Sequence, residues 1–323
     1  MGNDKALVTA VITTHNRSNI LRKAIESALN QTYKPIEIFV VDDCSRDDTK
    51  NVVAAYSAIN YIRNTKNLGG ARSRMKAARL AKGKYIAFLD DDDQWRPEKI
   101  ERQVNVAEAS DENLAVVTCS AEVHMEQYSF LLRPKMRGRI RSQVLTKDFN
   151  TVPSCHLFIK SIFDEIDGYD FDLPAHNEHD IWMKMAEADY YTERIIEPLV
   201  DIFETGHPKM MSNYHKRKES FGLFTEKWYA KVLNWHGNWH GKKLFNQYLC
   251  RIYASSAALS SYNGNPVAAL GFMLLAFKYI LPCSLNGRVS LKLFEAVVWL
   301  IVPQSNKHQL KFRVQRLSGT VDK

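Results

Sequence analysis

The sequence predicts an α/β protein with a mostly parallel sheet flanked by helices, followed by a helix-rich C-terminal extension. In the first hundred residues, short apolar runs rich in β-branched residues alternate with segments whose apolar residues recur at helical spacing. After about residue 205 the pattern becomes helical, basic and aromatic, without clear strands. Because alternating strands and helices build parallel sheets covered on both faces, we expect a layered domain at 1–205 and a helical region at 206–323.

The first hundred residues are expected to hold four strands and four helices. The strands are predicted at 7–14, 36–43, 60–63 and 85–89. Ser18 is expected to cap the first helix, and Pro97 to lie in the first turn of the fourth. From 114 to 163 the pattern is strand-like but irregular, and a helix returns at 174–188. This order predicts that polar residues at the carboxyl ends of several strands share one edge of the sheet.

The bulk composition is that of an ordinary globular protein. Of 323 residues, 45% are hydrophobic and 25% charged, which excludes a disordered chain. The net charge is +8, and basic residues dominate after about residue 205. This asymmetry favours an anionic partner such as a membrane surface, and solubility alone is the alternative. No nucleic-acid-binding motif is recognisable, so no nucleic-acid partner is expected.

Cysteine usage and the apolar segments indicate a cytoplasmic protein. The five cysteines are odd in number, widely spaced and without a C-x-x-C pair, which favours a reducing compartment. The first residues lack the pattern of a signal peptide. The apolar stretches at 266–282 and 293–303 fall short of the ~18 residues that a membrane span needs. Both are expected to be buried helices or helices lying on a membrane.

Four consecutive aspartates follow the strand predicted at 85–89. Asp90, Asp91, Asp92 and Asp93 would repel one another and raise one another's pKa values. A hard divalent cation, Mn²⁺ or Mg²⁺, would offset that repulsion with oxygen ligands and a substrate diphosphate. A solvated acidic turn is the alternative. An EF-hand is excluded because Trp95 occupies the glycine position of the loop. A dinucleotide-binding turn is excluded because no G-x-G-x-x-G follows the first strand.

Ordered sequence blocks carry a resemblance to a known family. They are VTAVITTHNR from Val8, VVDDCS from Val40, NLGGARSR from Asn67, GKYIAFLDDDDQWRPEK from Gly83, DGYD from Asp167, LPAHNEHDIWMKM from Leu173, and HPKMMS from His207. Over roughly residues 7–212 the sequence resembles inverting glycosyltransferase family 2, of the bacterial surface-polysaccharide type. That resemblance implies a GT-A catalytic domain, a Rossmann-like and mostly parallel sheet.

The resemblance also assigns roles to individual residues. It implies that Asp42 contacts the base of the nucleotide, that Asp90 and Asp91 face the ribose, and that Asp92 holds the metal. The remaining residues it places in the nucleotide pocket are Thr13, Arg17 and Arg72. His207 matches a family histidine that can reach the metal or the diphosphate, and a purely structural histidine is the alternative.

The catalytic base is expected in the stretch from Asn177 to Trp182. The family has an acidic residue followed by x-x-Leu-Trp, and aligning on Trp182 places Glu178 at that position. Glu178 shares a helical stripe with apolar residues, whereas Asp180 is expected to form an exposed ion pair with Lys184. We therefore favour Glu178 as the base over Asp180. The alternative is that Glu178 only stabilises the start of the helix.

Taken together, the resemblance implies a metal-assisted transfer of a sugar from a nucleotide-sugar. It implies a UDP-sugar donor, a saccharide or lipid-diphosphate-linked acceptor, and a role in polysaccharide or lipopolysaccharide synthesis. The C-terminal region is similar to tails that contact the cytoplasmic face of the inner membrane, and a helical cap on the catalytic domain is the alternative. A nucleotidyltransferase is disfavoured because no Gly-rich phosphate loop follows strand one. A non-catalytic, membrane-associated nucleotide-sugar-binding protein is the third hypothesis.

Overall fold

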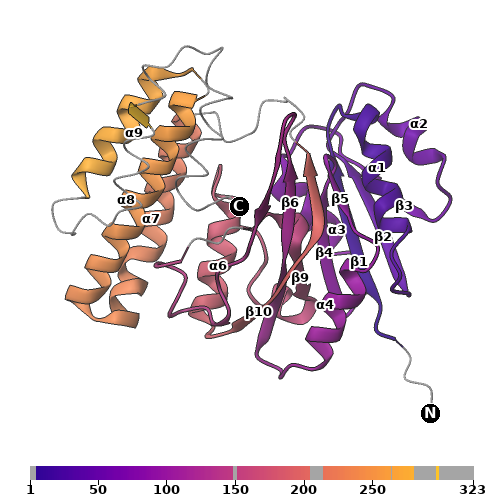
Figure 1. The fold of residues 1–323 in the computed structure, drawn as a ribbon, viewed down its shortest axis with the longest axis horizontal. Helices are drawn as coiled ribbons and strands as arrows, with labels where there is room; N and C mark the ends of the chain where they lie inside the picture. Colours follow the sequence, from indigo (N-terminus) through magenta and orange to yellow (C-terminus); the bar gives the residue numbers. More distant parts are fainter. Residues whose placement is uncertain (1–4, 148–150, 204–213, 263, 280–295, 298–323) are drawn as a thin grey trace. The chain divides into compact units, whose positions relative to one another are not determined.

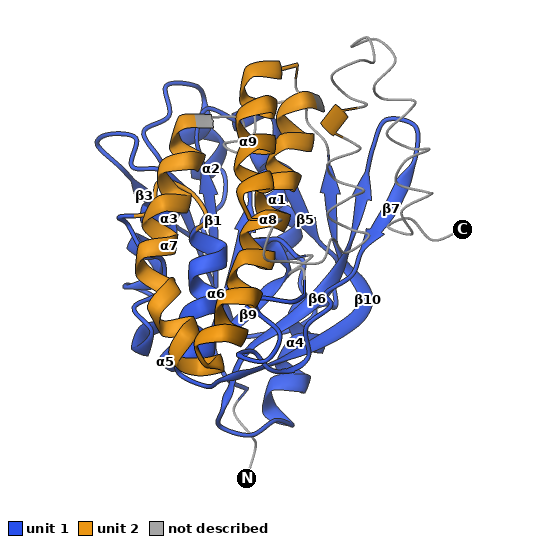
Figure 2. Ribbon diagram, turned by 90° about the vertical axis from the view of Figure 1, so that its left-hand side faces the viewer, with its two compact units in different colours: residues 1–172, 177–206 blue, residues 173–176, 207–323 orange. Residues whose placement is uncertain are grey.

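The chain divides into two compact units (Figure 2). The computed structural model describes residues 5–147, 151–203, 214–262, 264–279 and 296–297. The first unit comprises residues 1–172 and 177–206, and the second comprises residues 173–176 and 207–323. The first holds a mixed sheet flanked by helices, and the described residues of the second form three helices (Figure 1). The expected fold class, an α/β domain with a helical C-terminal region, is therefore confirmed.

The sheet of the first unit is parallel on one side and mixed on the other. Its strands are β1 (Val8–Thr14), β2 (Ile36–Asp42), β3 (Ile59–Arg63), β4 (Tyr85–Asp90), β5 (Asp93–Trp95), β6 (Leu114–His124), β7 (Ser129–Leu132), β8 (Gly138–Arg139), β9 (His156–Ile159) and β10 (Tyr191–Phe203). Their order is β3-β2-β1-β4-β9-β6-β10-β5, with β7 beside β6 and β8 beside β10. The first four strands of that order are parallel, whereas β9 runs antiparallel to both β4 and β6.

Helices cover both faces of the sheet because successive side chains on each strand point to opposite faces. The helices of this unit are α1 (Ser18–Leu29), α2 (Thr49–Ala54), α3 (Gly70–Ala78), α4 (Lys99–Glu108), α5 (Lys160–Glu165) and α6 (Asn177–Glu187), with a 3-10 turn η1 (Pro153–Cys155). Ala87 and Leu89 of β4 belong to the core shared with α1, α2 and α4. Phe88 points the other way and packs edge-on against Phe158, and at a tilt against Phe163 of α5.

Two helix starts differ from the sequence prediction. Ser18 is the first residue of α1 and makes no side-chain cap, because the cap position is taken by Arg17. The Ser18 amide instead donates to the Asp47 carboxylate at 2.8 Å. Pro97 precedes α4 rather than lying in its first turn, because the cap residue is Glu98. In both cases a residue next to the predicted one takes the cap position, which local sequence preferences do not resolve.

The start of α3 is built by the N-L-G-G sequence together with a carboxylate from β2's end. Gly69 has φ of +85°, a conformation that residues with a β-carbon rarely adopt. This turn lets the amides of Leu68 and Gly69 donate to Asp43 at 2.8 and 2.7 Å. Asp43 also accepts from the side-chain Nδ2 of Asn64 at 2.9 Å, so all of these bonds fix α3 beside the carboxyl end of β2.

The second unit is helical in its described residues. Its helices are α7 (Tyr214–His236), α8 (Asn238–Tyr262) and α9 (Pro266–Lys278). Among the helices that the structure describes, none combines the length and the hydropathy needed to cross a lipid bilayer. Helix α9 covers much of the first apolar stretch predicted above, and most of the second stretch lies outside the described residues. That the units are a catalytic domain and a membrane-associated region stays a prediction.

Candidate active site

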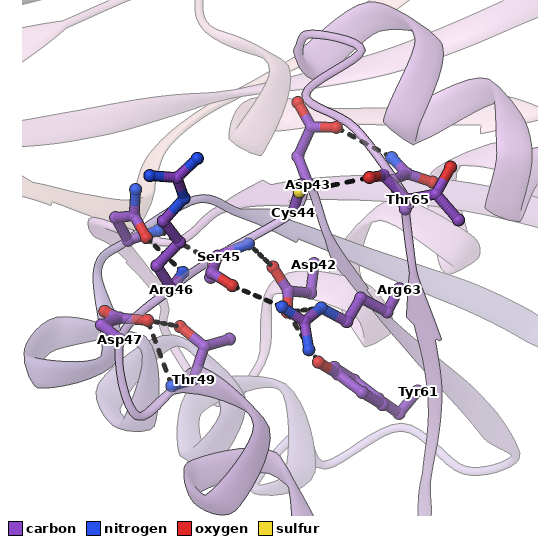
Figure 3. A network of polar contacts seen from close by, with 12 residues as sticks. Asp42, Asp43, Cys44, Ser45, Arg46, Asp47, Thr49, Tyr61, Arg63 and Thr65 are labelled. Carbon is purple, nitrogen blue, oxygen red and sulfur yellow. Dashed lines mark hydrogen bonds and ion pairs between the residues drawn. The ribbon is translucent and has the colours of Figure 1, made fainter.

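The carboxyl end of β2 carries a wall of polar groups around Asp42 (Figure 3). Asp42 is 1% exposed and accepts hydrogen bonds from the Ser45 amide at 2.7 Å and the Tyr61 hydroxyl at 2.6 Å. The Arg63 Nε lies 3.6 Å from the same carboxylate. Burial, and to a smaller extent the hydrogen bond to Asp42, raises the pKa of Tyr61. The Asp42 carboxylate is thus held in a fixed orientation by groups of its own chain.

Strand β1 brings this wall close to the four aspartates. Thr14 pairs with Asp42 on one side of β1, and Thr13 pairs with Asp90 on the other. Because neighbouring strands lie ~5 Å apart, the two carboxylates project from strands about 10 Å apart. The sheet therefore brings Thr13, Asp42 and Asp90 to one edge, as the topology of the sequence predicts.

The acidic segment does not point uniformly into solvent. Asp90 ends β4 and Asp93 begins β5, which turns back to pair with β10. Asp91 and Asp93 are 4% and 5% exposed. Burial raises the pKa of Asp91, and burial together with the charge of Asp90 raises that of Asp93 well above the ordinary value. Carboxylate oxygens of Asp90, Asp92 and Asp93 lie within 4.8 Å of one another, a hard-oxygen donor set of the kind that Mg²⁺ or Mn²⁺ takes.

Two arginines of the same unit offset part of this negative charge. The Arg17 Nη1 lies 2.8 Å from the Asp91 Oδ1 and 3.1 Å from the Asp92 Oδ2. Arg74 of α3 donates to Asp90. The chain itself therefore offsets part of the repulsion among the aspartates, whereas the sequence had predicted only a divalent cation for that role.

Arg74 also joins the acidic segment to the proposed base. Its Nη1 lies 3.8 Å from the Glu178 Oε1, and its guanidinium stacks over the Tyr169 ring at 5.8 Å. The Tyr169 hydroxyl donates to the Glu178 Oε2 at 3.4 Å. Burial raises the pKa of Glu178 to about 7, although 32% of the side chain stays exposed, and the charge of Arg74 opposes that rise. A carboxyl group with this pKa accepts a proton readily near neutral pH.

Asp180, the second candidate base, is placed differently from the prediction. Its side chain is 0% exposed, and its Oδ2 lies 3.8 Å from Lys184 Nζ. The expected ion pair is present, but the expectation that it is exposed was wrong. Lys184 also donates to the carbonyls of Asp167 and Gly168, in the turn that follows α5, at 3.2 and 2.9 Å.

Two other predicted residues lie apart from this geometry. Arg72 is exposed, donates to the Phe171 carbonyl at 3.3 Å and stacks over the Phe171 ring at 4.8 Å. His207 lies outside the described residues. The assignment of these residues and of the rest of the site to particular ligands stays a prediction.

Sequence reasoning missed three residues that hold the site together. Arg74 and Tyr169 contact Glu178, and Ser154 of η1 donates to the Asp93 Oδ2 at 2.5 Å. The Ser154 Oγ also accepts from the Asp90 amide at 3.1 Å. Arg74 and Tyr169 do stand inside the NLGGARSR and DGYD blocks, two residues after Arg72 and Asp167. Ser154 has no comparable signal, because β9 reaches β4 only through long-range pairing.

A second cluster of residues of the types that bind metals, Glu122, His124 and Asp201, forms an ion-pair network with Arg96. Atoms of Glu122, His124 and Asp201 lie within 4.8 Å of one another. Arg96 makes two bonds to Asp201, at 3.0 and 2.7 Å, and one to Glu122 at 2.7 Å. The His124 Nε2 lies 2.7 Å from Asp201. Arg96 contacts both carboxylates of this group, which we therefore describe as an ion-pair network.

The fold is matched by solved structures of very different sequence. S. aureus TarS 1-349 in complex with UDP-GlcNAc superposes with a TM-score of 0.66 at 15% identity, covering 94% of this chain and 91% of that one. This likeness, together with the parallel strands β3-β2-β1-β4 and the carboxylates at their ends, defines the class: a protein of the GT-A fold.

Sequence comparisons then give the family. Residues 9–167 match the model of glycosyl transferase family 2. An uncharacterized glycosyltransferase of Rickettsia prowazekii is 34% identical over 200 residues, 59% of this chain and 62% of that protein. An Escherichia coli UDP-Glc:alpha-D-GlcNAc-diphosphoundecaprenol beta-1,3-glucosyltransferase, WfaP, is 43% identical over 104 residues, 32% of this chain and 41% of that protein. The chain belongs to glycosyltransferase family 2, and it spans less than two thirds of the length of these two relatives.

Proposed function

We propose that this protein is an inverting glycosyltransferase that moves a sugar from a UDP-sugar to a hydroxyl group of a saccharide or lipid-linked saccharide. One observation carries the proposal: Arg74 contacts both Asp90, at the end of β4, and Glu178, on α6. Asp90, on the side where the donor would bind, and Glu178, which would remove the proton, thus contact the same guanidinium. A sugar-transfer reaction needs this proximity between donor and base.

The nucleotide would bind along the carboxyl ends of β1, β2 and β4. Asp42 would accept a hydrogen bond from the base, sharing its carboxylate with Ser45 and Tyr61. Thr13 and Arg17 would lie near the nucleotide, and Asp90 and Asp91 would face the ribose. In support, the E. coli relative is named for UDP-glucose and the similar TarS structure contains UDP-GlcNAc.

A divalent cation fits the oxygen atoms at the end of β4. Asp92 would be its principal ligand, with Asp90 and Asp93 near enough to contribute, directly or through water. His207 remains a further candidate ligand. When bound, Mn²⁺ or Mg²⁺ supplies charge neutralisation to the leaving diphosphate. The role of the chain is to hold the carboxylates at the end of β4 and the proposed base in a fixed arrangement, and Arg74 contributes by contacting both Asp90 and Glu178.

Glu178 would take the proton of the acceptor hydroxyl. Its pKa of about 7 leaves a substantial carboxylate fraction at neutral pH, while a stronger proton affinity than an ordinary glutamate favours the transfer. The oxygen then attacks the anomeric carbon from the face opposite the diphosphate, forming the glycosidic bond as the carbon–oxygen bond to the diphosphate breaks. One displacement inverts the configuration and requires no covalent intermediate. Asp180 is the weaker candidate because its carboxylate is buried against Lys184.

The acceptor is proposed to be membrane-associated. Residues 207–323 contain 17 Lys and Arg but only four Asp and Glu. Helix α9 also exposes large apolar side chains: Val267, Leu270, Leu274 and Phe277. Basic charge next to apolar side chains favours binding at an anionic lipid surface. The diphosphoundecaprenol acceptor in the name of the E. coli relative supports the same proposal, with a peripheral position on the membrane and a role in surface-polysaccharide synthesis.

The proposal is tested by incubating the protein with a panel of nucleotide-sugars and Mn²⁺. We expect metal-dependent release of UDP from one UDP-sugar, and NMR of the sugar formed should show the anomer opposite to that of the donor. Glu178→Gln should reduce the rate by ~10²-fold or more, the usual contribution of a general base. Retention of configuration would overturn the single displacement. Release of pyrophosphate from a nucleoside triphosphate would favour a nucleotidyltransferase instead. If no sugar transfer is found and Glu178→Gln binds membranes as well as the unmodified protein does, a non-catalytic protein is favoured.

A further inference from the structure

We propose that Arg17 is a displaceable counter-ion, which occupies the cation-binding face of Asp92 until a nucleoside diphosphate arrives. The metal and the nucleotide would then bind synergistically, each weakly without the other. This inference rests on the proposed function, since it assumes that Asp92 receives the cation. It adds that the chain itself sets the order in which the site fills.

The geometry places one guanidinium nitrogen between two carboxylates of different accessibility. The Arg17 Nη1 contacts the Asp91 Oδ1 at 2.8 Å and the Asp92 Oδ2 at 3.1 Å. The Asp91 side chain is 5% exposed and Asp92 is 23% exposed. A buried carboxylate that loses its partner is costly, so Asp91 is expected to keep Arg17. Asp92 is the partner that Arg17 can give up.

A divalent cation and Arg17 compete for the same oxygen. A hard cation binds a carboxylate oxygen at ~2.0–2.2 Å, closer than the hydrogen bond it replaces. An ion on the Asp92 Oδ2 would therefore lie beside the Arg17 guanidinium, and the two positive charges would repel each other. In the absence of another anion, Arg17 thus weakens metal binding.

A diphosphate removes that competition by offering Arg17 a new partner. A guanidinium forms charge-assisted hydrogen bonds to phosphate oxygens, and 25% of the Arg17 side chain is exposed. Movement from Asp92 to the diphosphate removes the competing positive charge from this carboxylate while the contact with Asp91 remains. By linkage, the metal then raises nucleotide affinity by the same factor by which the nucleotide raises metal affinity.

The backbone around Arg17 permits this movement of the side chain alone. Arg17 is the cap residue of α1, and its carbonyl accepts from the amides of Ile20 and Leu21 at 3.1 Å each. The backbone is therefore fixed while the side chain projects toward the acidic segment. Arg74 is different, because its side chain is 13% exposed and it is enclosed by Asp90, Glu178 and the Tyr169 ring. Arg74 is a permanent part of the site, and Arg17 is the exchangeable charge.

The test measures Mn²⁺ binding without turnover, from the electron paramagnetic resonance signal of free Mn²⁺. The unmodified protein, Arg17→Gln and the control Arg22→Gln are titrated with Mn²⁺, each with and without saturating UDP. Arg22 lies on the same helix, is exposed, and contacts Tyr56 rather than the acidic segment. Melting curves establish that each variant is folded.

Without UDP, Arg17→Gln should bind Mn²⁺ at least ~10-fold more tightly than the unmodified protein, within the usual range of coupling between sites. With UDP that advantage should disappear, so the factor by which UDP raises Mn²⁺ affinity falls ~10-fold. Arg22→Gln should match the unmodified protein in both conditions. Arg17→Lys keeps a positive charge but loses the planar fork, and should lie between the two; it replaces Arg17→Gln if that variant does not fold.

Equal Mn²⁺ affinity of Arg17→Gln and the unmodified protein in the absence of UDP would overturn the counter-ion role. So would an unchanged coupling factor. These outcomes leave the proposed function intact if UDP still promotes Mn²⁺ binding. If the unmodified protein binds no Mn²⁺ even at saturating UDP, the metal-assisted function itself fails, and the two failures are thereby distinguished.

Discussion

The raised pKa of Glu178 makes a quantitative prediction about stability as well as catalysis. In the unfolded chain the carboxyl titrates near its ordinary value of 4.5, and in the folded protein near about 7. The difference of roughly 2.5 units corresponds to about 3 kcal/mol, and partial exposure of the side chain makes this an upper limit. Between these two pKa values the folded state binds more protons than the unfolded state. The free energy of unfolding that Glu178 contributes therefore falls as pH rises from about 4.5 to 7.

Replacing Glu178 by Gln removes that titration. Urea unfolding at several pH values between 5 and 8 should show Glu178→Gln gaining stability relative to the unmodified protein as pH rises, by up to about 3 kcal/mol. Glu187→Gln is the matched control, since Glu187 is the exposed last residue of the same helix. A stability difference between Glu178→Gln and the unmodified protein that is the same at pH 5 and pH 8 would refute the reasoning.

The same pKa predicts the pH dependence of the reaction. Only the ionised carboxylate can accept a proton, so turnover should rise with pH and level off above about 7. A rate that is independent of pH between 5 and 8, with chemistry limiting, would contradict Glu178 as the base.

Three further predictions follow from other buried charges. Arg74→Gln should move the midpoint of the pH–rate profile upward, because the arginine lowers the pKa of Glu178; an unchanged or lower midpoint would count against the pairing. Asp42→Asn should weaken UDP binding ~10-fold by calorimetry, the scale of one hydrogen bond to a charged group, and equal affinity would remove Asp42 from the nucleotide pocket. Burial lowers the pKa of the fully buried Lys99 from 10.5 to about 8. The charged lysine therefore destabilises the folded protein below pH 8, and this stability is recovered as pH rises from 8 toward 10.5. Lys99→Met should therefore be more stable at pH 7, by up to about 3 kcal/mol, with a smaller gain at pH 9.5, and a loss of stability at pH 7 would contradict this.

Much of the fold can be read from the sequence because it depends on local periodicity. The apolar runs at 7–14, 36–43, 60–63 and 85–89 correspond to β1 to β4, and their register brings Thr13, Asp42 and Asp90 to one edge. The position of β9 between β4 and β6 was not predictable, because strand neighbours in that half of the sheet are set by long-range pairing. The 3-10 turn that carries Ser154 to Asp93 depends on that same pairing.

The candidate site was predictable in its residue types but not in its charge balance. The spacing of Glu178 and Trp182 correctly places Ile181, Trp182 and Met185 on a buried stripe beside Glu178. It could not reveal that Asp180 is buried as well, since its partner Lys184 is bound by the carbonyls of residues 167 and 168 from another segment. Likewise, repulsion among adjacent aspartates predicts a need for positive charge without identifying its source. Arg17 and Arg74, from two other segments, supply part of it.

The central claim is that the end of β4 is shared by a divalent cation and a diphosphate, and calorimetry of UDP binding tests it most directly. UDP should bind the unmodified protein at least ~10-fold more tightly with Mn²⁺ than without it, and Asp92→Ala should abolish that difference while leaving metal-free binding in place. Equal UDP affinity with and without Mn²⁺ in the unmodified protein, or an undiminished effect of Mn²⁺ in Asp92→Ala, would contradict the account.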